Sequence, residues 1–199
     1  GIYSRVIEKQ LTELVQNSHR WDLVETNLVG NIPSVEEMED DSFKTRTVFQ
    51  SIPAEAAIGG KITKGSKGLS IKLNLFLRTD ASLLTQVTLE DHQKTDVKEV
   101  NEQVQSLYQQ LIKKLPYDGL VLSRSGNLVT LNLGAKDGVG NNQILTVVQI
   151  LKMVRHPKFQ FLISSEKEVI GKVKINKVDD YLSFAQVISE KERGVVQKD

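Results

Sequence analysis

The sequence predicts an α+β protein in which a two-layer α/β sandwich is followed by a small all-β barrel. Three observations support this prediction. Apolar and polar residues alternate over 69–78, which is typical of a strand with one buried face. A helical apolar pattern then covers 97–115 and ends at Pro116. Beyond Asp118 only strand-like segments follow.

The alternating stretch is the middle strand of a predicted antiparallel meander. Three strands and two short polar loops are expected in the order 56–63, 64–68, 69–78, 79–82 and 83–90. Glycines and an aspartate in the loops suit hairpin turns. In the middle strand, we expect Leu73 to be buried while Lys72 and Asn74 face water.

Helices are expected before and after this meander. The first covers 2–18, and a short strand is expected next at 21–26. Ser34 and Glu37 have the spacing of a capping box, and a further short helix should end before Pro53. Asp96 and Glu99 form the same signal at the start of the long helix, which is expected to pack on the apolar face of the sheet.

Two domains and a tail are predicted, covering 1–117, 118–192 and 193–199. The second domain contains six strand-like segments separated by turn clusters, and these segments lie at 118–123, 127–133, 143–151, 159–164, 168–178 and 181–188. Short strands with this punctuation favour a closed or nearly closed barrel. The polar tail is expected to be disordered.

Composition excludes several function classes. The 26 Lys and Arg residues nearly balance the 25 Asp and Glu residues, so no global field would recruit nucleic acid or an anionic membrane. With no cysteine, the chain has no disulfide and no thiolate nucleophile or metal ligand. No apolar run is long enough for a membrane span. The chain opens on Gly1 rather than Met, so we expect that a leader has been removed.

No motif predicts a catalytic residue, a cofactor or a metal site. The glycine-rich stretch 59–68 is followed by a strand, whereas a phosphate loop needs a helix start. The acidic run 36–41 lacks the spacing of a calcium loop and suits a helix N-terminus. His19, His92 and His156 show no metal-binding spacing. We therefore expect a protein that is not an enzyme and works through its surfaces.

Two groups of residues are candidate partner contacts. One lies along the edge of the meander, where a partner strand could pair by β-augmentation, and the other lies in a barrel loop. The candidates are Lys61, Lys64 and Lys67 in the first group and Arg155, His156, Phe159 and Phe161 in the second.

The order of these elements resembles a known family. The glycine-bearing strand AIGGKI, the alternating strand GLSIKLNLFLRT and the helix VNEQVQSLYQQLIKKL are similar to the N-terminal domain of the TolB family and to the middle domain of the flagellar ring assembly protein FlgT. This resemblance covers about 1–117. The segments NLVTLNLGAKDGV and VIGKVKINKVDDYLSFAQVI resemble the small β-barrel that ends FlgT, with Gly134, Gly138 and Val139 in its turn.

The resemblance implies a bacterial, periplasmic or otherwise extracytoplasmic scaffold protein. Its expected role is envelope assembly, including flagellar motor ring assembly, and its expected partners are envelope or flagellar basal-body proteins rather than nucleic acid. TolB-like domains usually begin with an apolar strand, whereas this chain begins at its first helix. Two other functions stay open: a sensory or regulatory ligand-binding module, and an OB-like nucleic-acid-binding protein.

Overall fold

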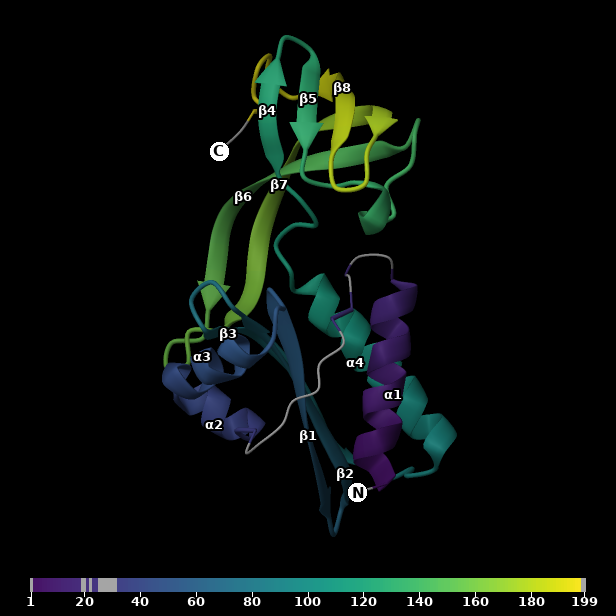
Figure 1. Ribbon diagram of the computed structural model, residues 1–199, viewed down its shortest axis with the longest axis vertical. Coiled ribbons are helices and arrows are strands. Elements are labelled where there is room, and N and C mark those ends of the chain that lie inside the picture. The colour runs from purple at the N-terminus through teal and green to yellow at the C-terminus, as the bar shows by residue number, and fades with distance from the viewer. Residues whose placement is uncertain (1, 19–20, 22, 25–31, 198–199) are drawn as a thin grey trace. The chain divides into compact units, whose positions relative to one another are not determined.

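The computed structural model describes residues 2–18, 21, 23–24 and 32–197, and the chain divides into two compact units (Figure 1). The first unit comprises Gly1–Leu14, Leu23–Lys114 and Val154–Ser164, and the second comprises Val15–Asp22, Leu115–Met153 and Ser165–Asp199. The sequence analysis placed all of 118–192 in one domain, whereas the structure assigns Val154–Ser164 to the first unit.

The first unit is built on a three-stranded antiparallel sheet with the order β1-β2-β3. Its strands are β1 (Ala56–Gly65), β2 (Gly68–Leu77) and β3 (Ser82–His92). Gly65 pairs with Gly68 across a two-residue turn, and the pairing of β1 with β2 continues without a shift to Ala56 and Leu77. The predicted meander is confirmed.

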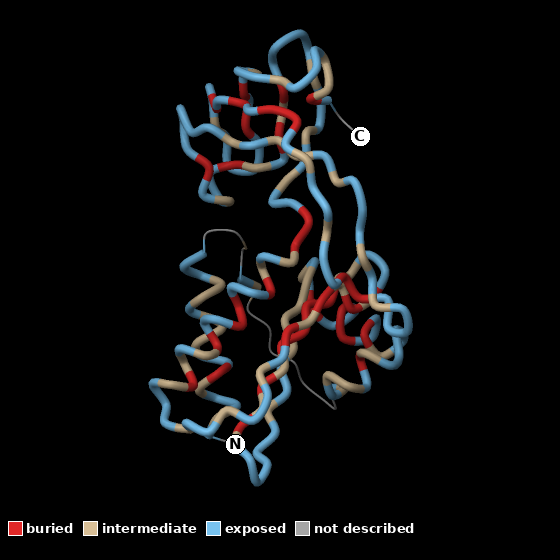
Figure 2. Tube along the Cα trace, turned by 180° about the vertical axis from the view of Figure 1, so that it is seen from behind, coloured by how far each residue is buried: buried red, intermediate tan, exposed pale blue. Residues whose placement is uncertain are grey.

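Two helices, α1 (Ile2–Asn17) and α4 (Val97–Lys113), lie on one side of this sheet (Figures 1 and 2). The Asp96 side chain accepts the N–H of Glu99 at 3.1 Å and caps α4, as the sequence predicts. The apolar stripe of α4 and one face of β2 are buried, and these residues are Val100, Val104, Leu107, Leu111, Leu69, Ile71, Leu73 and Leu75. Leu73 is therefore buried, as expected.

Two short helices, α2 (Val35–Asp40) and α3 (Ser42–Ser51), cover part of the other face of the sheet (Figure 1). The Ser34 hydroxyl accepts the N–H of Glu37, and the Glu37 carboxylate accepts the N–H of Ser34, so the predicted capping box is present. Buried side chains from both helices pack with β2 and β3, namely Met38, Val48, Phe49, Phe76 and Leu83. Helices thus cover both faces at this end, which makes three layers rather than the two predicted.

The prediction that Asn74 faces water is wrong. Its side chain is fully buried, and its Nδ2 donates to Glu39 Oε1 of α2 at 2.5 Å. The Lys72 ammonium forms an ion pair with the same carboxylate, and neither partner is more than 22% exposed. Alternation along the strand indicated a wet face because it could not show that α2 supplies a polar partner there.

The turn between β6 and β7 belongs to the first unit. Phe161 packs into the cluster formed by α2, α3 and the sheet, and is 8% exposed. The Thr85 hydroxyl donates to the carbonyl of Leu162 at 2.8 Å. The strand expected at 159–164 is not separate, because Leu162 begins the long strand β7.

The second unit contains a five-stranded sheet with the order β4-β5-β8-β7-β6. The strands are β4 (Val121–Ser125), β5 (Leu128–Leu131), β6 (Ile144–Arg155), β7 (Leu162–Val178) and β8 (Ser183–Glu190), and a short 3-10 helix, η1, covers Ala135–Asp137. Its core contains Val129, Leu131, Val173, Ile175 and Ala185. The closed barrel is not confirmed: within residues 32–197, β4 and β6 are the two edges of the sheet. A barrel needs pairing around its whole circumference.

The prediction of a disordered tail is wrong for the described residues 193–197. Val196 is fully buried in the core of the second unit. Arg124 donates to the carbonyl of Val196 at 2.8 Å and forms an ion pair with Glu190. Glu190 also accepts the N–H groups of Gly194 and Val196, both at 3.2 Å. A polar composition does not show that one valine has a core position.

The short strand predicted at 21–26 is not observed where the structure can be described. Trp21, Leu23 and Val24 are not in a strand, and the rest of the predicted strand 21–26 lies outside the described residues.

Burial on both faces of β2 should be measurable. Leu73→Ala should lower the free energy of unfolding by about 2–5 kcal/mol and Phe76→Ala by about 3–5 kcal/mol, because each leaves a cavity. Lys98→Ala on the exposed side of α4 should change it by less than about 0.5 kcal/mol. Urea unfolding of the three variants tests this. A cost for Phe76→Ala as small as that of Lys98→Ala would show that the second face is not packed.

Glu190 should make the second unit sensitive to acid. The hydrogen bond from Arg124, with further bonds from Gly194 and Val196, lowers the pKa of Glu190 from 4.5 to about 2. The unfolded chain therefore binds this proton more readily, so the stabilisation is complete above pH 4.5 and is lost as the pH falls toward about 2.

Glu190→Gln should accordingly lower the urea midpoint at pH 7, and the difference from wild type should shrink as the pH falls from 4.5 toward 2. Glu168→Gln, which removes an exposed ion pair with Lys191, is the control and should change the midpoint little. A difference between Glu190→Gln and wild type that stays constant with pH would contradict this role.

Candidate functional site

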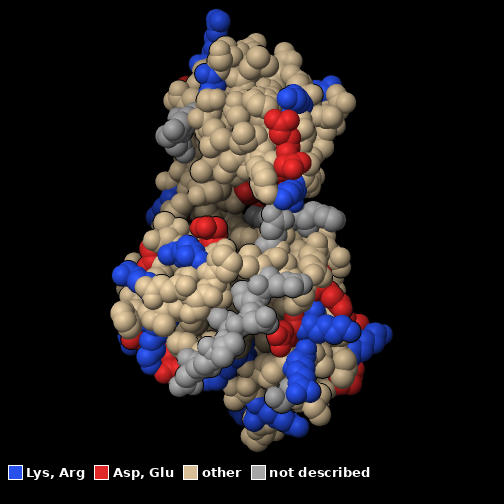
Figure 3. All heavy atoms as spheres, in the orientation of Figure 1, with Lys and Arg blue, Asp and Glu red and all other residues tan. Residues whose placement is uncertain are grey.

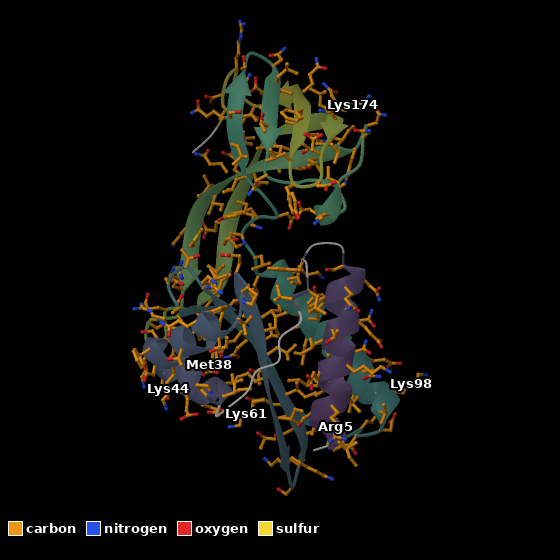
Figure 4. All side chains as sticks on the ribbon, in the orientation of Figure 1. Arg5, Met38, Lys44, Lys61, Lys98 and Lys174 are labelled. Atoms are coloured by element: carbon orange, nitrogen blue, oxygen red, sulfur yellow. The ribbon has the colours of Figure 1, made fainter. Side chains whose placement is uncertain are left out.

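The lysines predicted as contacts lie along the outer end of β1 and its turn. Lys61 extends from β1 toward α2 (Figure 4), where its ammonium forms an ion pair with Glu36. This hydrogen-bonded ammonium lowers the pKa of the Glu36 carboxyl. Lys64 and Lys67 are exposed, and neither forms an ion pair with any residue that the structure describes. The free charges are thus at the turn end of β1.

The second predicted group, in the β6–β7 turn, is a folded cluster. The His156 ring stacks on Phe159 and Phe161, with centroids 5.0 and 4.9 Å away. His156 Nδ1 accepts the N–H groups of Lys158 and Phe159 at 3.2 and 3.1 Å. Arg155 donates to the carbonyl of Gln160 at 3.1 Å.

Only part of this cluster is accessible. Phe159 is 49% exposed, whereas the buried Phe161 belongs to the core and does not offer the contact surface expected of it. No hydrogen bond, ion pair or ring contact links this cluster to the lysines of β1 among the described residues.

The free edge of β1 is the feature with the clearest binding geometry. Hydrogen-bonded and non-hydrogen-bonded pairs alternate along an antiparallel ladder. Gly65 and Gly68 close a two-residue turn, and the backbone carbonyl of Glu55 accepts the N–H of Arg78 at 2.9 Å. The pairs Gly65–Gly68 and Glu55–Arg78 are therefore both hydrogen-bonded. Odd-numbered residues of β1 therefore bond to β2. The N–H and C=O groups of the even-numbered residues, Ile58, Gly60, Ile62 and Lys64, point to the free edge.

This edge has few of the features that prevent strand pairing. Natural edge strands are commonly short, or carry proline or a bulge. β1 has ten residues, no proline and an unshifted register with β2. Within residues 2–18, 21, 23–24 and 32–197, no strand pairs with its outer side. Its remaining protection is charge from Lys64, because Lys61 is paired with Glu36, so an acidic strand would be favoured over a basic one.

The sequence analysis named the lysines of this edge but not Gly60 and Ile62, whose backbone groups point outward. The signal was present in the two glycines of the turn: once Gly65 and Gly68 are known to close it as a pair, the outward residues follow by counting. What was missing was the length of the turn, since 64–68 was read as a longer loop.

A shallow cavity of about 340 Å³ lies over the polar end of the sheet beside α2. Its lining includes Glu36, Lys61, Thr63, Ser70, Lys72 and Glu90. Both lysines are already paired, Lys61 with Glu36 and Lys72 with Glu39. The lining therefore offers hydroxyl and carboxylate oxygens, and among the described residues it contains no histidine to act as a base near neutral pH.

The histidines and acidic residues considered as candidates from the sequence lie in different helices, strands and turns. His92 ends β3, and His156 is in the β6–β7 turn, while His19 lies outside the described residues. The acidic run serves α2 and α3: Glu37 caps α2 and Asp41 caps α3. Among the described residues, no three His, Asp or Glu side chains are placed to hold a metal ion. Nor does any helix in that part of the chain have the length and apolar character to cross a membrane.

Comparison with known proteins gives a weak likeness in structure. No family model matches the chain, and no curated protein matches its sequence. Among solved structures, TolB from Acinetobacter baumannii matches with a TM-score of 0.38 and 11% sequence identity, over 94% of this chain and 57% of that chain. The chain thus spans little more than half the length of the TolB chain.

The alternation of backbone groups along β1 is testable without a partner. The amides of Ile58, Gly60, Ile62 and Lys64 should exchange with solvent faster than those of Gly59, Lys61 and Thr63, because only the latter bond to β2. Hydrogen exchange followed by NMR, corrected for intrinsic rates, measures this. Equal protection of both sets would show that the outer edge of β1 is already paired.

Proposed function

We propose that this chain is a non-enzymatic interaction module that binds an extended segment of a partner by strand addition to β1. The observation that carries this proposal is the outward row of backbone groups on a long, regular edge strand, which no strand among the described residues pairs with. Main-chain hydrogen bonds provide affinity in this mode, and side chains beside the edge provide selectivity. Lys64 and Lys67 favour a partner strand with acidic residues near the turn end of β1.

The rest of the first unit supports this role. β2 is packed on both faces and β1 is fully paired with it, so the edge is held in a fixed conformation before a partner arrives. A rigid edge loses little conformational entropy on binding, which favours affinity. Gly60 adds no side chain beside the outward groups at the centre of the edge.

We further propose an extracytoplasmic, bacterial location and a scaffold role in envelope assembly, with flagellar motor ring assembly as the specific case. The support is the resemblance of the strand and helix pattern in 1–117 to TolB-like domains, and of the C-terminal segments to the end of FlgT. The expected partners are envelope or basal-body proteins. Fractionation of cells that express the natural gene should place the protein outside the cytoplasm. Recovery in the cytoplasmic fraction alone would contradict the location and leave strand addition to be judged separately.

Gly60 provides a matched pair of variants for strand addition. Gly60→Pro removes an outward N–H without removing a bond to β2, whereas Gly60→Ala keeps that N–H. A Cβ at this position would meet Leu73 Cδ2 at 3.4 Å, an ordinary contact, so Gly60→Ala should fold. Gly60→Pro should fold because proline is tolerated on an edge strand whose N–H faces outward. Binding of proteins from envelope extracts should be retained by Gly60→Ala and weakened about tenfold by Gly60→Pro.

Quantitative affinity capture followed by mass spectrometry provides the measurement, and thermal melts of both variants control for folding. Thr63→Pro, which removes a bond to β2, should instead destabilise the first unit. Partners that bind Gly60→Pro as well as they bind Gly60→Ala would rule out strand addition at β1.

A further inference from the structure

The outer face of β4, β5 and β8 in the second unit is nearly free of charge. Although 26% of the chain is charged, these three strands contain only Arg124 and Glu190 as charged residues. Those two pair with each other, and their side chains are only 15% and 12% exposed. Figure 3 shows mostly uncharged atoms over these strands. This face is therefore not an ordinary solvated sheet surface.

Large apolar side chains lie together on this face. Leu128 of β5 is 56% exposed, and Phe184 and Ile188 of β8 are 38% and 48% exposed. Leu128 lies opposite Gln186, so Phe184 is its diagonal neighbour on the same side of the sheet. Ile188 lies further along β8, where the pairing of β8 with β7 shifts by one residue. The alternating residues of these strands, including Val129 and Ala185, are buried on the other side.

A row of lysines borders the apolar residues on β7. Lys172 and Lys174 alternate with the fully buried Val173 and Ile175, and Lys174 lies directly opposite Gln186. Both lysines are exposed, and Figure 4 labels Lys174 at the margin of the unit. Neither forms an ion pair with another residue in the described part of the chain. Their charges are thus free to meet an external group.

We propose that this surface, defined by Leu128, Phe184, Ile188, Lys172 and Lys174 and called the β8 face, docks a partner protein segment with an apolar anchor flanked by carboxylates. An apolar centre with a charged rim is the usual anatomy of a protein interface. Unpaired lysines at the rim favour an acidic partner by raising its association rate. Leu128, the most exposed of the three apolar residues, is the expected anchor point.

A protein segment fits this face better than nucleic acid or a lipid surface. Single-stranded nucleic acids bind to rows of aromatic side chains, whereas Leu128 and Ile188 have no ring on which a base could stack. Insertion into a membrane interface is typical of amphipathic helices with a wide apolar face. Here the apolar side chains stand on strands of a sheet and are 38–56% exposed. The inference does not rest on strand addition, because β1 belongs to the first unit.

Photo-crosslinking in cells of the natural source tests the β8 face with the complete chain. A benzophenone side chain at position 128 should form a discrete protein adduct, whereas one at Val97, which is 51% exposed on α4, should not form it. Lys172→Glu combined with Lys174→Glu should reduce the adduct about tenfold. Reversing acidic residues in the crosslinked peptide of the partner should restore it.

A matched control makes the same change in net charge elsewhere. Lys9→Glu combined with Lys98→Glu alters two lysines of the first unit that are 81% and 86% exposed, and should leave the adduct unchanged. Thermal melts of both double variants should match wild type. The proposal is overturned by the absence of an adduct at 128 above that at 97, by an adduct that survives the change at Lys172 and Lys174, or by equal loss in the control.

Two further probes separate the other classes of partner. Phosphatidylglycerol vesicles and a single-stranded oligonucleotide are each titrated into the purified chain and into Leu128→Ser. We expect that neither probe binds in a way that depends on Leu128. Binding to either one that is lost in Leu128→Ser would replace the protein partner with a lipid or nucleic-acid ligand.

Discussion

Burial of strand β2 on both faces is the constraint on which the first unit depends. Leu73 and its alternating neighbours face α1 and α4, while Phe76 faces α2 and α3. Once β2 is central and buried, β1 and β3 become the flanking strands of a short sheet. β3 contacts the turn between β6 and β7 through Thr85 and Leu162, whereas β1 is left with an outward row of backbone groups. The candidate site is therefore a consequence of the core.

Polar contacts complete both units where apolar packing alone would leave groups unsatisfied. Glu39 binds both Lys72 and Asn74, which lets α2 lie over a strand position that a polar residue occupies. In the second unit, the Glu190 carboxylate accepts hydrogen bonds from Arg124 and from the N–H groups of the C-terminal segment. These bonds hold this segment over the core. Each is one carboxylate that accepts from several donors.

The two surfaces proposed here would bind in different ways. The β1 edge offers backbone groups, which pair with almost any extended segment and need side chains for selectivity. The β8 face offers side chains, so shape and charge decide what binds there. Each surface lies within a single unit. A chain with two such surfaces suits a protein that joins others.

Local patterns in the sequence determined most of the secondary structure. The period of two in β2, the capping residues Ser34 and Asp96 and the apolar stripe of α4 each depend on neighbours within a few residues, so they can be read without the fold. The same holds for the turn glycines, from which the outward residues of β1 can be counted. The low charge of β4, β5 and β8 was also present in the sequence.

Only the tertiary structure decided which polar and apolar residues are covered by distant segments. Asn74 and Phe76 are buried because α2 and α3 fold back over the sheet, and Phe161 is buried because its turn joins the first unit. Val196 likewise has a core position that its polar neighbours concealed. Burial depends on contacts between residues far apart in the chain, and alternation within one strand carries no information about what lies above it.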